Sequence, residues 1–98
     1  MTTDNYYIYM LTNRKNKMIY VGMINDRVRK VYENQSDLLR DFTKQYKVNK
    51  LVYYETAEDA GKAIEREKEI KDYSHEKKKN LIETINPGWI DLMDRLIK

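Results

Sequence analysis

The sequence contains no cysteine, one proline, three glycines and one histidine. Without cysteine the chain forms neither a disulfide framework nor a thiolate metal site, and a cytoplasmic location is the expectation. A metal site built from several histidines is excluded because there is only one. With 41% hydrophobic and 36% charged residues, this composition indicates an ordered globular domain rather than a disordered chain.

Long hydrophobic runs are also missing, so we expect no membrane-spanning segment. The first ten residues lack the basic and apolar regions of a signal peptide. At 98 residues the chain is long enough for one hydrophobic core, and we expect a single domain over residues 1–98. The 19 basic and 16 acidic residues leave a net charge of +3, which permits an anionic partner without requiring one.

Tyrosine, in contrast, is abundant, with nine tyrosines against a single phenylalanine. Tyrosine buries a ring while keeping a hydroxyl group available, so it suits half-solvated sheets, stacking surfaces and proton transfer. For most of the nine, simple packing in strands is the more economical explanation.

Aromatic and β-branched runs between polar turns predict three strands, over residues 6–12, 18–23 and 50–56. The first two strands are separated by about five polar residues and should form an antiparallel hairpin. Alternation along these strands places Tyr9, Tyr20 and Gly22 on one surface, although cross-strand aromatic packing alone would explain the two rings.

Capping residues followed by helical periodicity predict helices that begin after Asp26, Thr56 and Ser74. The third should end near Asn86, and the amphipathic tail 89–98 should form a further short helix. The expected order is β-β-α-β-α-α, a small α+β domain with a three-stranded antiparallel sheet flanked by helices.

Glu67 is the most unusual residue of the helix that follows Thr56. The apolar face of that helix is predicted to contain Ala60, Ala63, Ile64 and Ile70. Glu67 falls at the centre of this face, whereas its neighbour Arg66 is expected to point elsewhere. An inward carboxylate is costly unless a cation compensates it, so Glu67 either forms an internal ion pair or binds a metal ion such as Mg²⁺ or Mn²⁺.

The helix after Asp26 carries Arg27, Lys30 and Asn34 along one flank, at spacings of three and four residues. Cations in the first turn oppose the helix dipole, which suggests an anionic partner. The simpler explanation is a solvated basic face.

Together these residues resemble the GIY-YIG nuclease superfamily, in particular its small stand-alone bacterial proteins. Tyr7-Ile8-Tyr9 corresponds to the first motif, with Tyr7 in place of the nominal glycine, and Tyr20-Val21-Gly22 to the second. The resemblance continues through FTKQY (42–46), LVYYE (51–55), REKEIKDYS (66–74) and NPGW (86–89).

The resemblance implies metal-dependent hydrolysis of a DNA phosphodiester bond by water. Tyr9 and Tyr20 would be the catalytic tyrosines, and Glu67 would hold a single divalent ion, Mg²⁺ or Mn²⁺. Gly22 would let the substrate approach closely, and Asn86 would support the phosphate or the site.

The chain departs from the family pattern on the helix after Asp26. The usual arginine falls on Lys30, and a frequent histidine falls on Asn34. Lysine keeps the charge but loses the bidentate contact to phosphate, and asparagine cannot exchange a proton. Arg27, one turn before Lys30, is positioned to replace the missing guanidinium in part.

These departures leave two interpretations and a third, simpler one. The first is an active or weakened DNA endonuclease, and the alternative is a catalytically inactive nucleic-acid-binding module with the same fold. The third is a protein-interaction domain without affinity for nucleic acid. The sequence does not fix the oligomeric state.

Overall fold

A computed structural model describes residues 5–13, 15–26, 50–92 and 95. Its elements, in chain order, are β1 (Tyr6–Thr12), β2 (Ile19–Asn25), β3 (Lys50–Ala57), α3 (Ala60–Asp72) and α4 (His75–Ile85). The strands form an antiparallel sheet in the order β2-β1-β3, which confirms the predicted α+β class. The predicted helix after Asp26 lies outside the described residues, with Arg27, Lys30 and Asn34.

The β1–β2 hairpin is confirmed, and its turn is held by asparagines. The side-chain oxygen of Asn13 accepts hydrogen bonds from the backbone of Lys17 at 2.8 Å and of Met18 at 3.1 Å. Asn16 has a φ of 58°, in the left-handed region that asparagine tolerates better than most residues. The turn therefore has a defined shape set by local hydrogen bonds.

β3 continues further than predicted, and Thr56 does not cap the next helix. Thr56 pairs with Tyr7 inside the sheet, and Asp59 caps α3 by accepting a hydrogen bond from the backbone of Lys62 at 3.0 Å. Threonine and aspartate both cap helices, but β-branched threonine also favours a strand. The prediction was wrong because pairing with β1 extends the strand to Ala57.

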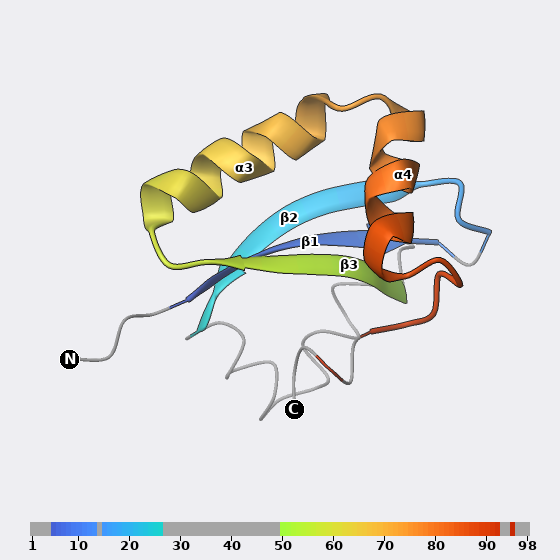
Figure 1. Ribbon diagram of the computed structural model, residues 1–98, viewed down its shortest axis with the longest axis horizontal. Coiled ribbons are helices and arrows are strands. Elements are labelled where there is room, and N and C mark those ends of the chain that lie inside the picture. The colour runs from blue at the N-terminus through green and yellow to red at the C-terminus, as the bar shows by residue number, and fades with distance from the viewer. Residues whose placement is uncertain (1–4, 14, 27–49, 93–94, 96–98) are drawn as a thin grey trace.

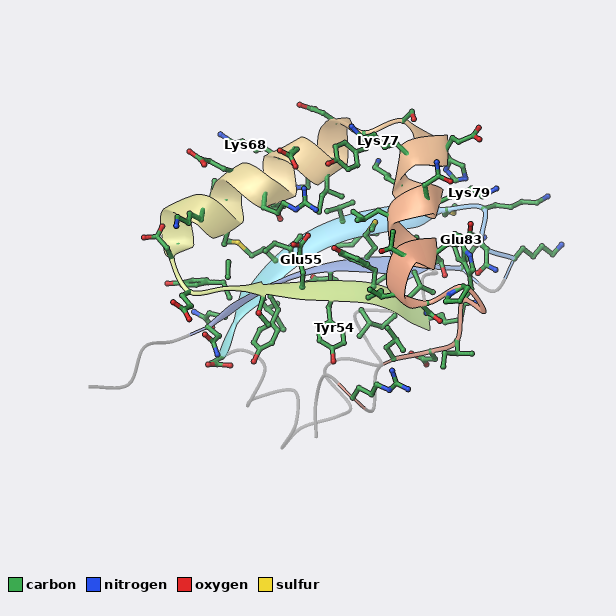
Figure 2. The ribbon with its side chains drawn as sticks, viewed as in Figure 1. Tyr54, Glu55, Lys68, Lys77, Lys79 and Glu83 are labelled. Atoms are coloured by element: carbon green, nitrogen blue, oxygen red, sulfur yellow. The ribbon has the colours of Figure 1, made fainter. Side chains whose placement is uncertain are left out.

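The two sides of the sheet differ in what covers them. In Figure 1, α3 and α4 lie on the same side of the sheet. The core on this side contains Ile8, Met10, Val21, Val52, Tyr53, Ala63, Ile70, Ile82 and Trp89. Residues that alternate with these along the strands, including Tyr9 and Leu11, belong to a second cluster on the other side. Figure 2 shows this alternation at Tyr54 and Glu55, whose side chains leave β3 in opposite directions.

α4 begins and ends where the sequence predicted. Ser74 accepts a hydrogen bond from the backbone of Lys77 at 3.1 Å, and Asn86 is the C-terminal cap. The tail prediction was wrong for residues 89–92, which are not helical. Here Leu92 is buried and its backbone N–H donates to the carbonyl of Leu51 at 2.7 Å, so contact with β3 replaces the first helical turn. Within the described residues, no helix is long and apolar enough to cross a membrane.

Candidate active site

Tyr9, Tyr20 and Gly22 lie together on the side of the sheet away from α3, and we call these three residues the tyrosine surface. Tyr9 on β1 faces Gly22 on β2 in the hairpin register. The ring centroids of Tyr9 and Tyr20 are 6.4 Å apart, with the ring planes tilted by 37°. The predicted common surface is therefore confirmed, and it follows from strand alternation.

Gly22 allows the ring of Tyr9 to lie directly against the backbone of β2. A Cβ atom at position 22 would be 2.4 Å from the Tyr9 hydroxyl oxygen and 2.5 Å from its Cζ atom. No side chain fits in that space without moving the ring. Tyr20 is 36% exposed, so this residue of the pair is partly open to solvent.

The end of β2 is fixed to the start of β1 by Asp26. One carboxylate oxygen of Asp26 accepts a hydrogen bond from the Tyr7 hydroxyl at 2.8 Å, and the other accepts one from the Asn5 backbone at 2.9 Å. The Asp26 backbone N–H also donates to the carbonyl of Asn5 at 2.9 Å. These bonds fix the point from which the chain continues towards Arg27, Lys30 and Asn34.

Glu67 lies on α3, on the opposite side of the sheet from the tyrosine surface. Its side chain is 20% exposed, and its Oε2 atom is 3.7 Å from the Nζ atom of Lys71. The carboxylate is thus half-buried, in line with the expected inward position. Lys71 is 53% exposed, so this is a loose ion pair near the surface rather than a buried one.

The buried face of α3 is rotated relative to the prediction. Ala63 and Ile70 are fully buried, but Ile64 is 43% exposed and Ala60 is exposed. Arg66, which was expected to point elsewhere, is half-buried beside Glu67. The centre of the face therefore lies between Arg66 and Glu67, because these two side chains flank the line from Ala63 to Ile70.

Arg66 is the centre of a polar network that the sequence did not reveal. Its Nε atom donates to Glu55 on β3 at 2.7 Å, and its Nη1 atom donates to Glu69 and to the Tyr73 hydroxyl, the latter at 3.2 Å. The Tyr53 hydroxyl donates to the same Glu55 oxygen at 3.0 Å. The available signal was the alternation of β3, which places Tyr53 and Glu55 on the side that α3 covers.

The network changes the proton affinity of its members. Burial, and then the charge of Glu55, raise the pKa of Tyr53 to about 12. Burial acts to lower the pKa of Arg66, but the hydrogen bonds to Glu55 and Tyr73 and the charge of Glu55 together outweigh it and hold the pKa above its ordinary value. Hydrogen bonds from Tyr73 and Arg66 lower the pKa of Glu69. The polar groups of the network form hydrogen bonds with one another. The network therefore joins α3 to β3 rather than providing a free acid or base.

Asn86 is buried, with only 4% of its surface exposed. Its side-chain nitrogen donates to the carbonyls of Val52 at 3.0 Å and Ile90 at 2.8 Å, and its side-chain oxygen accepts from the Ile90 backbone at 3.1 Å. All of these bonds are internal. Asn86 therefore holds the end of α4 against β3, which suits a supporting role better than a direct contact with substrate.

Among the described residues, no group of three or more acidic or histidine side chains could hold a metal ion. Mg²⁺ does not need such a cage, because it is commonly held by one or two carboxylates together with substrate phosphates and water. The half-buried Glu67 supplies one such carboxylate, and its loose ion pair leaves it able to exchange Lys71 for a metal ion. The described residues therefore offer one carboxylate that a divalent ion could use.

Residues 5–80 match the family described as the GIY-YIG catalytic domain. The chain belongs to the GIY-YIG family. The match includes the tyrosine surface, all three strands, α3 and Glu67, so the resemblance drawn from the motifs is confirmed. It also includes the segment that contains Arg27, Lys30 and Asn34.

Two relatives have similar sequences over most of their length. A UPF0213 protein of the bacterium Staphylococcus saprophyticus is 32% identical over 79 residues, which cover 81% of this chain and 95% of the relative. A UPF0213 protein of Haloquadratum walsbyi is 31% identical over 80 residues, which cover 82% of this chain and 89% of the relative. No solved structure matches the chain.

Proposed function

We propose that this protein is a metal-dependent DNA endonuclease that hydrolyses phosphodiester bonds. The observation that carries the proposal is the tyrosine surface, which lies within the residues that match the family. Its two tyrosine rings have centroids 6.4 Å apart, and the Tyr9 ring packs against Gly22. A nuclease family implies a nucleic-acid substrate, and DNA is the substrate that we propose.

In this proposal the tyrosine hydroxyls handle the proton of the attacking water. Tyr20 is the more exposed of the two. After losing its own proton to solvent, its phenolate oxygen would accept the proton of the attacking water, while Tyr9 orients it. Gly22 sets the position of the Tyr9 ring, which occupies the space beside it. Lys30 supplies positive charge to the phosphate, with Arg27 on the same flank, and Asn34 adds a hydrogen-bonding group.

Glu67 would hold the divalent ion, Mg²⁺ or Mn²⁺. When bound, the ion would polarise the phosphate and stabilise the charge that develops on its oxygens. α3 contacts β2, which is an edge strand of the described sheet and carries both Tyr20 and Gly22. A phosphodiester at this edge would lie between the tyrosine surface and the helix that carries Glu67.

The first test compares Glu67→Gln with Glu65→Gln, its exposed neighbour of the same chemistry, on branched, nicked and linear DNA. With Mg²⁺ or Mn²⁺ we expect cleavage by the unchanged protein and by Glu65→Gln. The Glu67→Gln rate should fall by at least about 10²-fold, and a chelator should stop all cleavage. The proposal is wrong if the unchanged protein cleaves none of these substrates, or if Glu67→Gln cleaves as fast as Glu65→Gln.

The alternative function is a catalytically inactive module that binds nucleic acid. Lysine at position 30 and asparagine at position 34 favour it, because the loss of a preorganised donor to a phosphate costs about 10²–10³ in rate. A Lys30→Arg, Asn34→His double variant separates the two functions. If the unchanged protein is inactive and the double variant cleaves DNA in the presence of a metal ion, the protein is a binding module that has lost only these two groups.

A further inference from the structure

A cavity of about 410 Å³ lies between the β1–β2 turn and α4. Its lining residues are Lys15, Asn16, Lys17, His75, Lys79, Glu83 and Trp89. In Figure 2, Lys79 and Glu83 extend from α4 on the side that faces the β1–β2 turn. None of the residues of the tyrosine surface contributes to this cavity, and neither does Glu67.

The lining of the cavity is predominantly basic. Three lysines line it, and its single carboxylate, Glu83, accepts a hydrogen bond from the indole nitrogen of Trp89 at 2.9 Å. The bond directs part of the negative charge of Glu83 towards the buried Trp89. His75, the first residue of α4, adds ring nitrogens close to the positive end of the helix dipole.

Both walls of the cavity have a defined shape. The turn that carries Lys15 and Lys17 is held by the Asn13 side chain and by a hydrogen bond from the backbone of Asn16 to the carbonyl of Asn13 at 3.0 Å. The opposite wall is α4, where His75, Lys79 and Glu83 follow one another at four-residue intervals along one side of the helix. Lysines from two separate elements thus converge on one solvent-filled recess.

We propose that this cavity binds the phosphate backbone of the nucleic-acid substrate at a second site, away from the cleaved bond. Clustered lysines contact phosphates as point charges and release counterions when they do so. The proposal rests on the proposed function only in taking nucleic acid as the partner, and it does not require that the chain cleaves it.

The cavity lies beside the turn that leads into β2, close in sequence to Tyr20. Lys17 precedes Tyr20 by three residues, which is a separation of about 10 Å along an extended chain. That distance corresponds to roughly three nucleotides of duplex rise. A nucleic-acid strand bound at the cavity is therefore within a few nucleotides of the β2 edge, and it would pass around that edge to reach the tyrosine surface on the other side of the sheet.

The test uses a Lys17→Gln, Lys79→Gln double variant, which removes one charge from each wall. A Lys62→Gln, Lys68→Gln variant is the matched control, because it removes two charges from exposed positions on α3. DNA affinity is measured for each protein at several salt concentrations, with a chelator present so that no cleavage occurs.

For the cavity variant we expect the slope of log affinity against log salt to become shallower by about 1.8, and the control to change by less than half of that. The corresponding loss at 0.1 M salt is about eightfold for each lysine that contacts a phosphate. Equal losses in the two variants would contradict the proposal and indicate a diffuse electrostatic attraction. Unchanged binding by the cavity variant would contradict it as well.

Two further measurements test the cavity proposal independently of the endonuclease proposal. If the unchanged protein binds DNA but cleaves none, and the cavity variant loses affinity, the cavity proposal holds while the endonuclease proposal fails. If inorganic phosphate at millimolar concentration competes as well as a short oligonucleotide of equal phosphate content, the cavity binds free anions and the backbone proposal is wrong.

Discussion

Gly22 shows how a single residue can determine the geometry of the candidate active site. Of the three glycines in the chain, Gly22 has the closest neighbouring atom, and that atom belongs to Tyr9. Its φ is not positive, so the backbone conformation does not require glycine. What requires it is the approach of the Tyr9 ring, which occupies the space of a Cβ atom.

We therefore expect Gly22→Ala to displace the Tyr9 ring and to lower the free energy of unfolding by about 1–3 kcal/mol. Gly88→Ala is the control, because the nearest atom to its Cβ would be 3.7 Å away, an ordinary contact, and little change should follow. Urea denaturation of both variants measures the difference.

A double-mutant cycle tests the cause of this effect. In a Tyr9→Ala background the ring is absent, so Gly22→Ala should cost much less than it does in the unchanged protein. Equal costs in the two backgrounds would show that something other than the Tyr9 ring requires glycine at position 22.

At the scale of secondary-structure elements, local signals predicted the strands well and the contacts between elements poorly. The tyrosine surface was predictable because alternation along two neighbouring strands depends only on the sequence of each strand. The cap of α3 was not, because both Thr56 and Asp59 are suitable and only pairing with Tyr7 decides between them. The burial of Arg66 depends on Glu55, a partner on another element, and no helical pattern contains that information.

The α3–β3 junction gives a prediction about pH. The pKa of Tyr53 is about 12 in the folded protein against an ordinary value of 10.0, so the folded state holds this proton more tightly. Its contribution to stability is complete below pH 10.0 and is lost as the pH rises towards about 12. In Tyr53→Phe no proton is released at this position, so the free energy of unfolding should fall less steeply over that range.

Urea denaturation just below pH 10.0 and near pH 12 measures this difference. Tyr20→Phe is the control, because Tyr20 is exposed and lies outside the network. If Tyr53→Phe and the unchanged protein lose stability equally between the two pH values, the proton on Tyr53 does not contribute.

At the scale of the whole molecule, the order of the secondary-structure elements was predictable, whereas the packing of α4 against β3 was not. The order follows from strand and helix signals that are local in sequence. The placement of α4 against β3 depends on a buried amide, Asn86, which bonds to Val52 and to Ile90. The family resemblance assigned Asn86 to the phosphate or the site, and an asparagine before proline and glycine gives no sign of burial.

The last prediction concerns this amide. Asn86→Ala leaves the carbonyl of Val52 and the backbone of Ile90 without these partners, so we expect the free energy of unfolding to fall by about 2–4 kcal/mol. For a chain of this length, the loss corresponds to a decrease in Tm of roughly 10–25 °C. Asn80→Ala, an exposed change on α4, is the control and should stay within about 0.5 kcal/mol.

The same variant separates a supporting role of Asn86 from direct contact with substrate. At a temperature where both variants are fully folded, Asn86→Ala should bind DNA as tightly as Asn80→Ala does, because the amide makes its bonds inside the protein. Thermal unfolding followed by circular dichroism, with a DNA-binding assay at low temperature, measures both effects. A variant that keeps its stability but loses DNA affinity would return Asn86 to the substrate-binding residues, as the family resemblance first implied.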